Sequence, residues 1–272
     1  MSISMESLAQ VQGLVLPDQS QLPGVSLTEL NQRAALLART DRKYMLTIDR
    51  ARALLADLPE GAKVLDIAGQ RQFHYQSVYY DTGDFLCYQL AAHQRRHRFK
   101  VRARRYCDSG EQWLEVKTRG LRGQTVKDRL PIGQAQIDRP TGLAIEGAGR
   151  RDWVATTLAG RGVEGAPVDR LVPTLQVDYD RITLLLPDGS RCTIDQGMAW
   201  QALDSGRDET VPSLVIVETK TAAHISDIDH WLWRHGSRPA RISKYASGLA
   251  LLYSFLGANR WHRTLMTIDD MD

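Results

Sequence analysis

Four cations alternate along one short stretch of the sequence. In RFKVRARRY, residues 98–106, every second position is basic: Arg98, Lys100, Arg102 and Arg104. Successive side chains of an extended strand point to opposite faces, so these four share one face at a spacing of about 6.6–7 Å. Two unit charges about 7 Å apart repel by roughly 2.4 kcal/mol at an effective dielectric near 20. The repulsion is small in water, but inside a walled cavity the row requires a bound anion to offset it.

The same alternation of ionic residues continues in other segments. Shared faces carry Glu115, Lys117 and Arg119, then Lys127 and Arg129, then Arg191 and Asp195, and then Glu218 and Lys220. An exposed strand protected from edge pairing by its charges would explain any one row. Several mainly cationic rows favour a closed sheet whose lumen holds a phosphate chain. A carboxylate in that lumen would hold a divalent metal, and Glu218 is the preferred ligand. The alternative for Glu218 is a salt bridge to Lys220 or to a neighbouring arginine.

The elements that must position these rows can be predicted from periodicity and turn signals. Helices are expected at about 26–38, with Ser26 as the cap, and at 47–58, with Thr47 as the cap and Pro59 beyond the end. Strands are expected at about 39–47, at four places within 72–132, in a hairpin over 173–202 and at 213–221. A middle helix and two C-terminal helices complete the chain. About eight strands with helices at both ends and in the middle predict an α+β fold dominated by antiparallel pairing.

Composition narrows the class of protein. The 272 residues are 43% hydrophobic and 25% charged, and the formal net charge is only +3, which disfavours a general nucleic-acid coat. Three scattered cysteines form neither a CxxC pair nor a disulfide framework, so a reducing cytoplasm is expected. Neither a secretory leader nor a long apolar run is evident, and any membrane association would require a membrane-protein partner.

Several motifs together resemble one known family. RKYML, YYDT, RRHRFKVRARRY, WLEVKTRG, VKDRLPI, PTLQVDYDRITL, LVIVETKT and RISKYASGLALL are similar, in order and spacing, to the polyphosphate polymerase (VTC) domain of the triphosphate tunnel metalloenzyme (CYTH-like) superfamily. The resemblance implies a closed tunnel of about eight antiparallel strands with flanking helices. It covers residues 26–257 as a single domain, leaving a poorly ordered tail at 1–25 and a C-terminal tail at 258–272. The ExExK signature of other superfamily members is absent.

The resemblance also implies roles for individual residues. The residues expected to act on the transferred phosphoryl group are Arg102, Arg104, Lys117, Arg181, Arg191 and Lys244. Those expected to bind the substrate or the phosphate chain are Lys43, Lys127, Tyr179, Arg241 and Ser243. Glu218 matches the metal-binding glutamate of the family, and the metal would be Mn²⁺ or Mg²⁺.

The leading hypothesis is transfer of the γ-phosphoryl group of a nucleoside triphosphate, ATP, to phosphate or to a growing polyphosphate. Such chemistry depends on positioning and charge neutralisation and needs no side-chain nucleophile. The alternatives are an inorganic triphosphatase or polyphosphatase, in which water is the acceptor, and a non-catalytic polyphosphate or nucleotide-binding module. Nucleic acid is a disfavoured partner.

Overall fold

The structure is a computed structural model that describes residues 22–33, 40–120, 124–134, 141–222 and 224–271. The strands are β1 (Gly24–Val25), β2 (Thr40–Thr47), β3 (Lys63–Leu65), β4 (Gln72–Asp81), β5 (Phe99–Tyr106), β6 (Glu111–Arg119), β7 (Thr125–Gln134), β8 (Val172–Leu185), β9 (Arg191–Ala202), β10 (Asp208–Val211) and β11 (Leu214–Thr221). The α-helices are α2 (Leu27–Arg33), α3 (Ile48–Ala56), α4 (Leu86–Ala92), α5 (Arg150–Gly160), α6 (Asp227–Arg234), α7 (Lys244–Leu252) and α8 (His262–Asp269). Short 3-10 helices are η3 (Thr141–Glu146), η4 (Val168–Arg170) and η5 (Asn259–Trp261).

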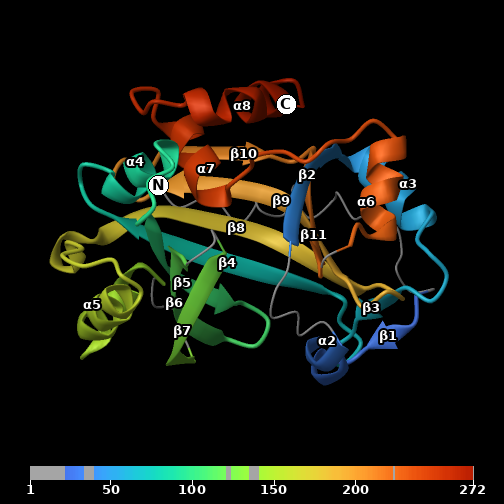
Figure 1. Cartoon of the computed structure of the whole chain (residues 1–272), viewed down its shortest axis with the longest axis horizontal. Coiled ribbons are helices and arrows are strands. Elements are labelled where there is room, and N and C mark those ends of the chain that lie inside the picture. The colour runs from blue at the N-terminus through green and yellow to red at the C-terminus, as the bar shows by residue number, and fades with distance from the viewer. Residues whose placement is uncertain (1–21, 34–39, 121–123, 135–140, 223, 272) are drawn as a thin grey trace.

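One large sheet organises the molecule. Eight strands follow each other in the order β2-β11-β9-β8-β4-β5-β6-β7, and every neighbouring pair on this path is antiparallel. The long strands β8 and β9 cross the molecule, with α3 and α6 together at one end and β5, β6 and β7 at the other (Figure 1). The α+β architecture and the eight antiparallel strands are therefore as the sequence predicts, while β1, β3 and β10 are short additions that it does not predict.

The sheet differs from the prediction in one respect, because it does not close by hydrogen bonds. Its terminal strands, β2 and β7, do not pair with each other within the described residues. The physical reason lies at the free edge of β2, where the Lys43 carbonyl accepts a hydrogen bond from the Ala240 amide at 2.7 Å. The segment that leads into α7 thus occupies the edge that β7 would need in order to close the barrel.

The two faces of the sheet have different surroundings. On one face of β2, β8, β9 and β11, apolar side chains such as Leu46, Ile194 and Val217 pack beneath α3 and α6. A larger core cluster packs η3 and α5 against the β4–β6 region and α7 against β8, β9 and β10. The opposite face of β2, β8, β9 and β11 carries ionic side chains, and the charged side chains of β5 and β6 meet them there.

Local signals account for the starts of α2 and α3. Ser26 caps α2 by accepting from the Glu29 amide at 3.1 Å, and Thr47 caps α3 by accepting from the Arg50 amide at 3.3 Å, as the sequence predicts. The region expected to be a C-terminal tail contains η5 and α8, and Trp261 and Ile268 are buried in the main core. Their wide spacing gives too weak a periodicity to be recognised in the sequence. Residues 1–21 of the expected N-terminal tail lie outside the described residues.

Candidate functional site

Ionic, tyrosyl and seryl side chains from eight strands and the start of α7 gather on one face of the sheet. We call this set the interior face. It comprises Lys43, Tyr75, Ser77, Tyr79, Lys100, Arg102, Arg104, Glu115, Lys117, Lys127, Tyr179, Arg181, Asp195, Glu218, Lys220, Ser243 and Lys244. Cations outnumber carboxylates in it, so the residues that the structure describes leave it with an excess of positive charge.

The alternating cations of β5 are held by partners on both neighbouring strands. Arg102 donates to Glu115 from Nε at 2.7 Å and from Nη2 at 2.5 Å, and it donates to the Tyr79 hydroxyl at 3.0 Å. Arg104 donates to the Tyr179 hydroxyl at 2.9 Å. Although burial raises the pKa of Glu115, Arg102 and the other nearby cations outweigh burial and hold that pKa well below its usual value. Glu115 is therefore an ionised anchor that orients Arg102.

A second carboxylate organises the cations of β8 and α7. Asp195 accepts from Arg181 at 2.6 and 2.7 Å in a bidentate pair, and it accepts from Lys244 Nζ at 2.7 Å. Burial opposes its charge, but these two cations prevail and lower the pKa of Asp195 to about 2. Asp195 consequently fixes two phosphate-binding candidates from distant parts of the chain beside one another.

A third carboxylate, Glu218, lies between two lysines. Its Oε1 is 2.8 Å from Lys43 Nζ on β2. Its Oε2 is 3.4 Å from the Nζ of Lys220, which lies on β11 like Glu218 itself. The salt bridge to Lys220, which the sequence left as the alternative to metal binding, is therefore present. Burial raises the pKa of Glu218, but Lys220 and Lys43 outweigh burial, so the carboxylate stays ionised.

Two lysines show how strongly the interior face demands an anion. Lys117 forms no hydrogen bond or ion pair with any described residue, and Arg102, together with burial, lowers its pKa well below the usual value. Lys100 donates to the Ser243 hydroxyl at 2.8 Å, and burial lowers its pKa to about 8. Both shifts have the sign expected for cations confined among cations. A bound polyanion would reverse them.

The start of α7 completes the site. Ser243 caps the helix by accepting from the Ala246 amide at 3.3 Å, and its hydroxyl also accepts the hydrogen bond from Lys100 Nζ. Gly248 allows α7 to approach β9, because a Cβ there would lie 2.1 Å from Trp200 Cδ1. The Trp200 indole in turn donates to the Lys244 carbonyl at 2.7 Å. The glycine in YASG thus has a packing role that positions Lys244.

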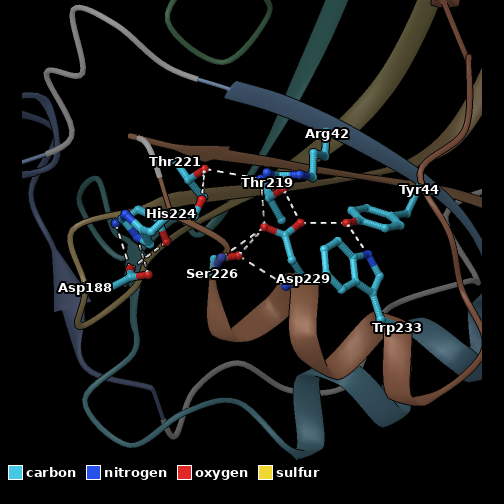
Figure 2. Close-up of polar contacts among 10 residues, drawn as sticks. Arg42, Tyr44, Asp188, Thr219, Thr221, His224, Ser226, Asp229 and Trp233 are labelled. Carbon is cyan, nitrogen blue, oxygen red and sulfur yellow. Dashed lines mark hydrogen bonds and ion pairs between the residues drawn. The ribbon is translucent and has the colours of Figure 1, made fainter.

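A buried polar network supports the strands of Lys43 and Glu218 from behind. Asp229 of α6 accepts from Tyr44 at 2.6 Å, from Thr219 at 2.7 Å and from Arg42 at 3.3 Å (Figure 2). These three residues adjoin Lys43 and Glu218 in sequence but point to the opposite face. The network therefore holds β2 and β11 in register beneath the Lys43–Glu218 pair, without itself facing the interior.

Ten of the twelve predicted site residues lie on the interior face; the exceptions are Arg191 and Arg241. Arg191 shares the face by alternation, but its guanidinium reaches Asn31 of α2 at 3.0 Å, away from the cations near Asp195. Arg241 is exposed. Lys100, Lys220, Asp195, Tyr79 and Ser77 were not among the predicted residues. The period-two alternation signals Lys100, Lys220 and Asp195, whereas the roles of Tyr79 and Ser77 depend on strand register.

The chain matches one known protein family over most of its length. The family model of the VTC domain matches residues 38–253, which include every strand of the eight-stranded path. The chain belongs to the VTC domain family. The family expected from the motifs is thus confirmed over most of the chain. No protein of curated function matched the chain significantly.

Solved structures also resemble this VTC domain. A Hippeastrum protein assigned as an adenylyl cyclase, with a dominant triphosphatase activity, is 17% identical, with a TM-score of 0.48 over 78% of this chain and 96% of that chain. A Pyrococcus horikoshii protein is 12% identical, with a TM-score of 0.41 over 78% and 99%. A Vibrio parahaemolyticus protein assigned as an adenylate cyclase is 14% identical, with a TM-score of 0.36 over 86% and 98%. We draw no functional conclusion from likenesses this distant.

The side chains of the VTC domain supply only some of the ligands that a divalent metal needs. Among the described residues, no group of three or more His, Cys, Asp or Glu side chains could hold a metal. Mg²⁺ in phosphate-transfer sites is commonly bound by one or two carboxylates plus substrate phosphates, however, and Glu218 offers one ionised carboxylate beside the cations. The interior face therefore fits a metal that arrives with phosphate.

No helix in the described part of the chain is long and apolar enough to span a membrane.

Proposed function

We propose that this VTC domain transfers the γ-phosphoryl group of ATP to phosphate or to the end of a polyphosphate chain. The observation that carries the proposal is the excess of cations on the interior face, above all Lys117, which has no partner among the described residues. Substrate and acceptor are both polyanions, so this reaction needs cations beyond those that pair with the three carboxylates of the face.

The proposed division of labour follows from the contacts. Arg104, Arg181 and Lys244 orient and neutralise the oxygens of the transferred group, because their carboxylate and hydroxyl partners fix them in place. Lys43, Lys100 and Lys127 extend the positive surface along the chain of phosphates. Glu218 would hold the metal, which supplies charge neutralisation at the terminal phosphates.

A phosphate acceptor is favoured over water by the same charge distribution. Water needs only a position and a base, whereas an anionic acceptor must be drawn into a site that already holds a triphosphate. The interior cations continue from Arg181 and Lys244, which pair with Asp195, to Lys127 on β7, beyond what one triphosphate requires. This continuity supports polymer synthesis over simple hydrolysis.

The test is to incubate the purified chain with ATP and Mn²⁺ and to resolve the products on a gel, with Glu218→Gln as the matched control. Long polymer from the wild type and none from the variant supports the proposal. Release of phosphate without polymer identifies a triphosphatase, and ATP binding without turnover identifies a binding module. Either of the last two results would overturn the proposed reaction.

A further inference from the structure

A group of four arginines lies beyond the end of the interior face that carries Lys100 and Lys117. The register of β5 and β6 pairs Phe99 with Thr118 and Lys100 with Lys117. Arg98 directly precedes β5, and Arg119 is the last residue of β6, so both come one residue farther out. By alternation Arg119 belongs to the side of Lys100 and Lys117. Arg98 adjoins it at the start of β5, where its guanidinium donates to the carbonyls of Gln94 at 3.2 Å and Arg95 at 2.8 Å. The row of cations that begins at Arg104 therefore continues out of the site.

Two more arginines reach the same place from the C-terminal part of the chain. Arg241 precedes Ser243 by two residues, and the Lys100–Ser243 hydrogen bond of 2.8 Å holds this segment against β5. The Arg241 carbonyl accepts from Thr264 of α8 at 3.4 Å, which ties it to the helix that follows η5. Arg260 of η5 has a guanidinium atom, Nη1, that is buried and has no hydrogen-bond partner.

The charges of these four arginines also act on one another, and we call the group the arginine cluster. Burial and the charges of Arg119 and Arg260 lower the pKa of Arg98. Burial and the charges of Arg241 and Arg119 lower the pKa of Arg260. None of the four forms an ion pair with a carboxylate anywhere in the described ranges, whereas Arg102, Arg181, Arg151 and Arg161 all do.

We propose that the arginine cluster binds the outer phosphates of a long polyphosphate whose end lies on the interior face. The inference rests on the proposed function and adds a direction and a selectivity to it. The chain enters or leaves past Arg98, Arg119, Arg241 and Arg260, and the protein holds long chains more tightly than short ones. A tripolyphosphate bound beside Arg104 and Lys117 does not reach the cluster.

The experiment measures the dissociation constants of tripolyphosphate and of a long-chain polyphosphate with the full chain. The variant is Arg98→Gln/Arg260→Gln, and the control is Arg50→Gln/Arg234→Gln, which removes the same net charge from exposed positions on α3 and α6. We expect the variant to lose about tenfold or more in affinity for the long chain. Its affinity for tripolyphosphate should change less than about twofold, and the control should bind both ligands nearly as the wild type does.

Three results would overturn the inference. The first is an equal loss in the control, which would mean that only net charge matters. The second is an equal loss for both ligands in the variant. The third is equally strong, variant-sensitive binding of single-stranded DNA, which would make the arginine cluster a nucleic-acid site. If the wild type failed to bind tripolyphosphate at all, the proposed function itself would fail, and this outcome is distinct from the other three.

Discussion

Lys43 and Glu218 face each other across the β2–β11 pair, with Lys43 Nζ 2.8 Å from Glu218 Oε1. The carboxylate that would bind a metal is therefore already neutralised, and Lys220 at 3.4 Å adds to this. A metal can take the carboxylate only if Lys43 finds another anion. Bound phosphate supplies one, so metal and phosphate should bind in a mutually dependent way.

The first prediction follows from this competition. Mn²⁺ alone should bind weakly to the wild type, and tripolyphosphate should tighten Mn²⁺ binding by at least about tenfold. Glu218→Gln should abolish this coupling while leaving part of the tripolyphosphate affinity, because the other cations remain. Titration of Mn²⁺ with and without tripolyphosphate, followed by electron paramagnetic resonance, measures the effect. Equal Mn²⁺ affinity in both conditions would rule out Glu218 as a shared ligand.

The second prediction concerns the fully buried Glu115. Its replacement by glutamine leaves Arg102 buried without its charge partner, which should lower the free energy of unfolding by about 3–5 kcal/mol. Tripolyphosphate should restore much of the loss, because a bound anion replaces the missing charge. Thermal unfolding with and without tripolyphosphate measures both effects.

A matched control for that prediction is Asp128→Asn. Asp128 pairs with Arg161 at 2.6 Å on a more exposed surface, so its loss should cost no more than about 1 kcal/mol. The pKa of Glu115 is depressed in the fold, so its contribution is present above the ordinary carboxyl pKa and is lost as the pH falls. A Glu115→Gln protein as stable as the wild type at neutral pH would contradict the assigned role.

The third prediction is a pH dependence of phosphate binding. Burial lowers the pKa of both Lys100 and Lys220 to about 8, and a bound polyanion should raise both values. These lysines are charged below about pH 8 and lose their protons above it, so tripolyphosphate affinity should fall as the pH rises through that value. Calorimetry near pH 8.5, in buffers of different ionisation enthalpy, should detect proton uptake on binding.

Lys100→Met separates the contribution of the lysine from that of the ligand's own protons. The variant should take up fewer protons than the wild type at the same pH. Identical uptake in both proteins would show that Lys100 does not titrate in response to phosphate.

The fourth prediction tests the close packing of α7. Gly248→Ala places a Cβ 2.1 Å from Trp200, which should cost about 1–3 kcal/mol and should weaken tripolyphosphate binding through Lys244. Gly257→Ala is the control, because nothing lies within 4 Å of a Cβ there. Thermal unfolding and calorimetry of the two variants make the comparison. Normal tripolyphosphate binding by a destabilised Gly248→Ala protein would show that Trp200 does not position Lys244 for binding.

The sequence predicts the strands and the cationic rows because both depend on local periodicity. Alternation alone places Arg102, Arg104 and Lys117 on charged faces, and the caps at Ser26 and Thr47 are equally local. What alternation cannot supply is register. The pairing of Arg181 with Asp195 and of Lys43 with Glu218 arises from contacts between residues far apart in the chain.

The open edge of the sheet escaped prediction for a related reason. Whether β7 reaches β2 depends on which segment first takes the β2 edge, and the Ala240–Lys43 hydrogen bond is a long-range contact. The arginine cluster likewise depends on long-range contacts, because it brings the start of β5 and the end of β6 together with η5. Arg260 lies outside every motif that suggested the family, so nothing in the sequence placed it near Arg98.

The central claim is that the interior face holds a chain of phosphates, and a crystal structure of the protein grown with tripolyphosphate and Mn²⁺ tests it most directly. The account predicts phosphate groups between Arg104, Arg181 and Lys244, one of them within hydrogen-bonding distance of Lys117, and Mn²⁺ bridging phosphate oxygens to Glu218. Tripolyphosphate bound only outside this face, with the Lys43–Glu218 and Arg181–Asp195 pairs unchanged, would contradict it.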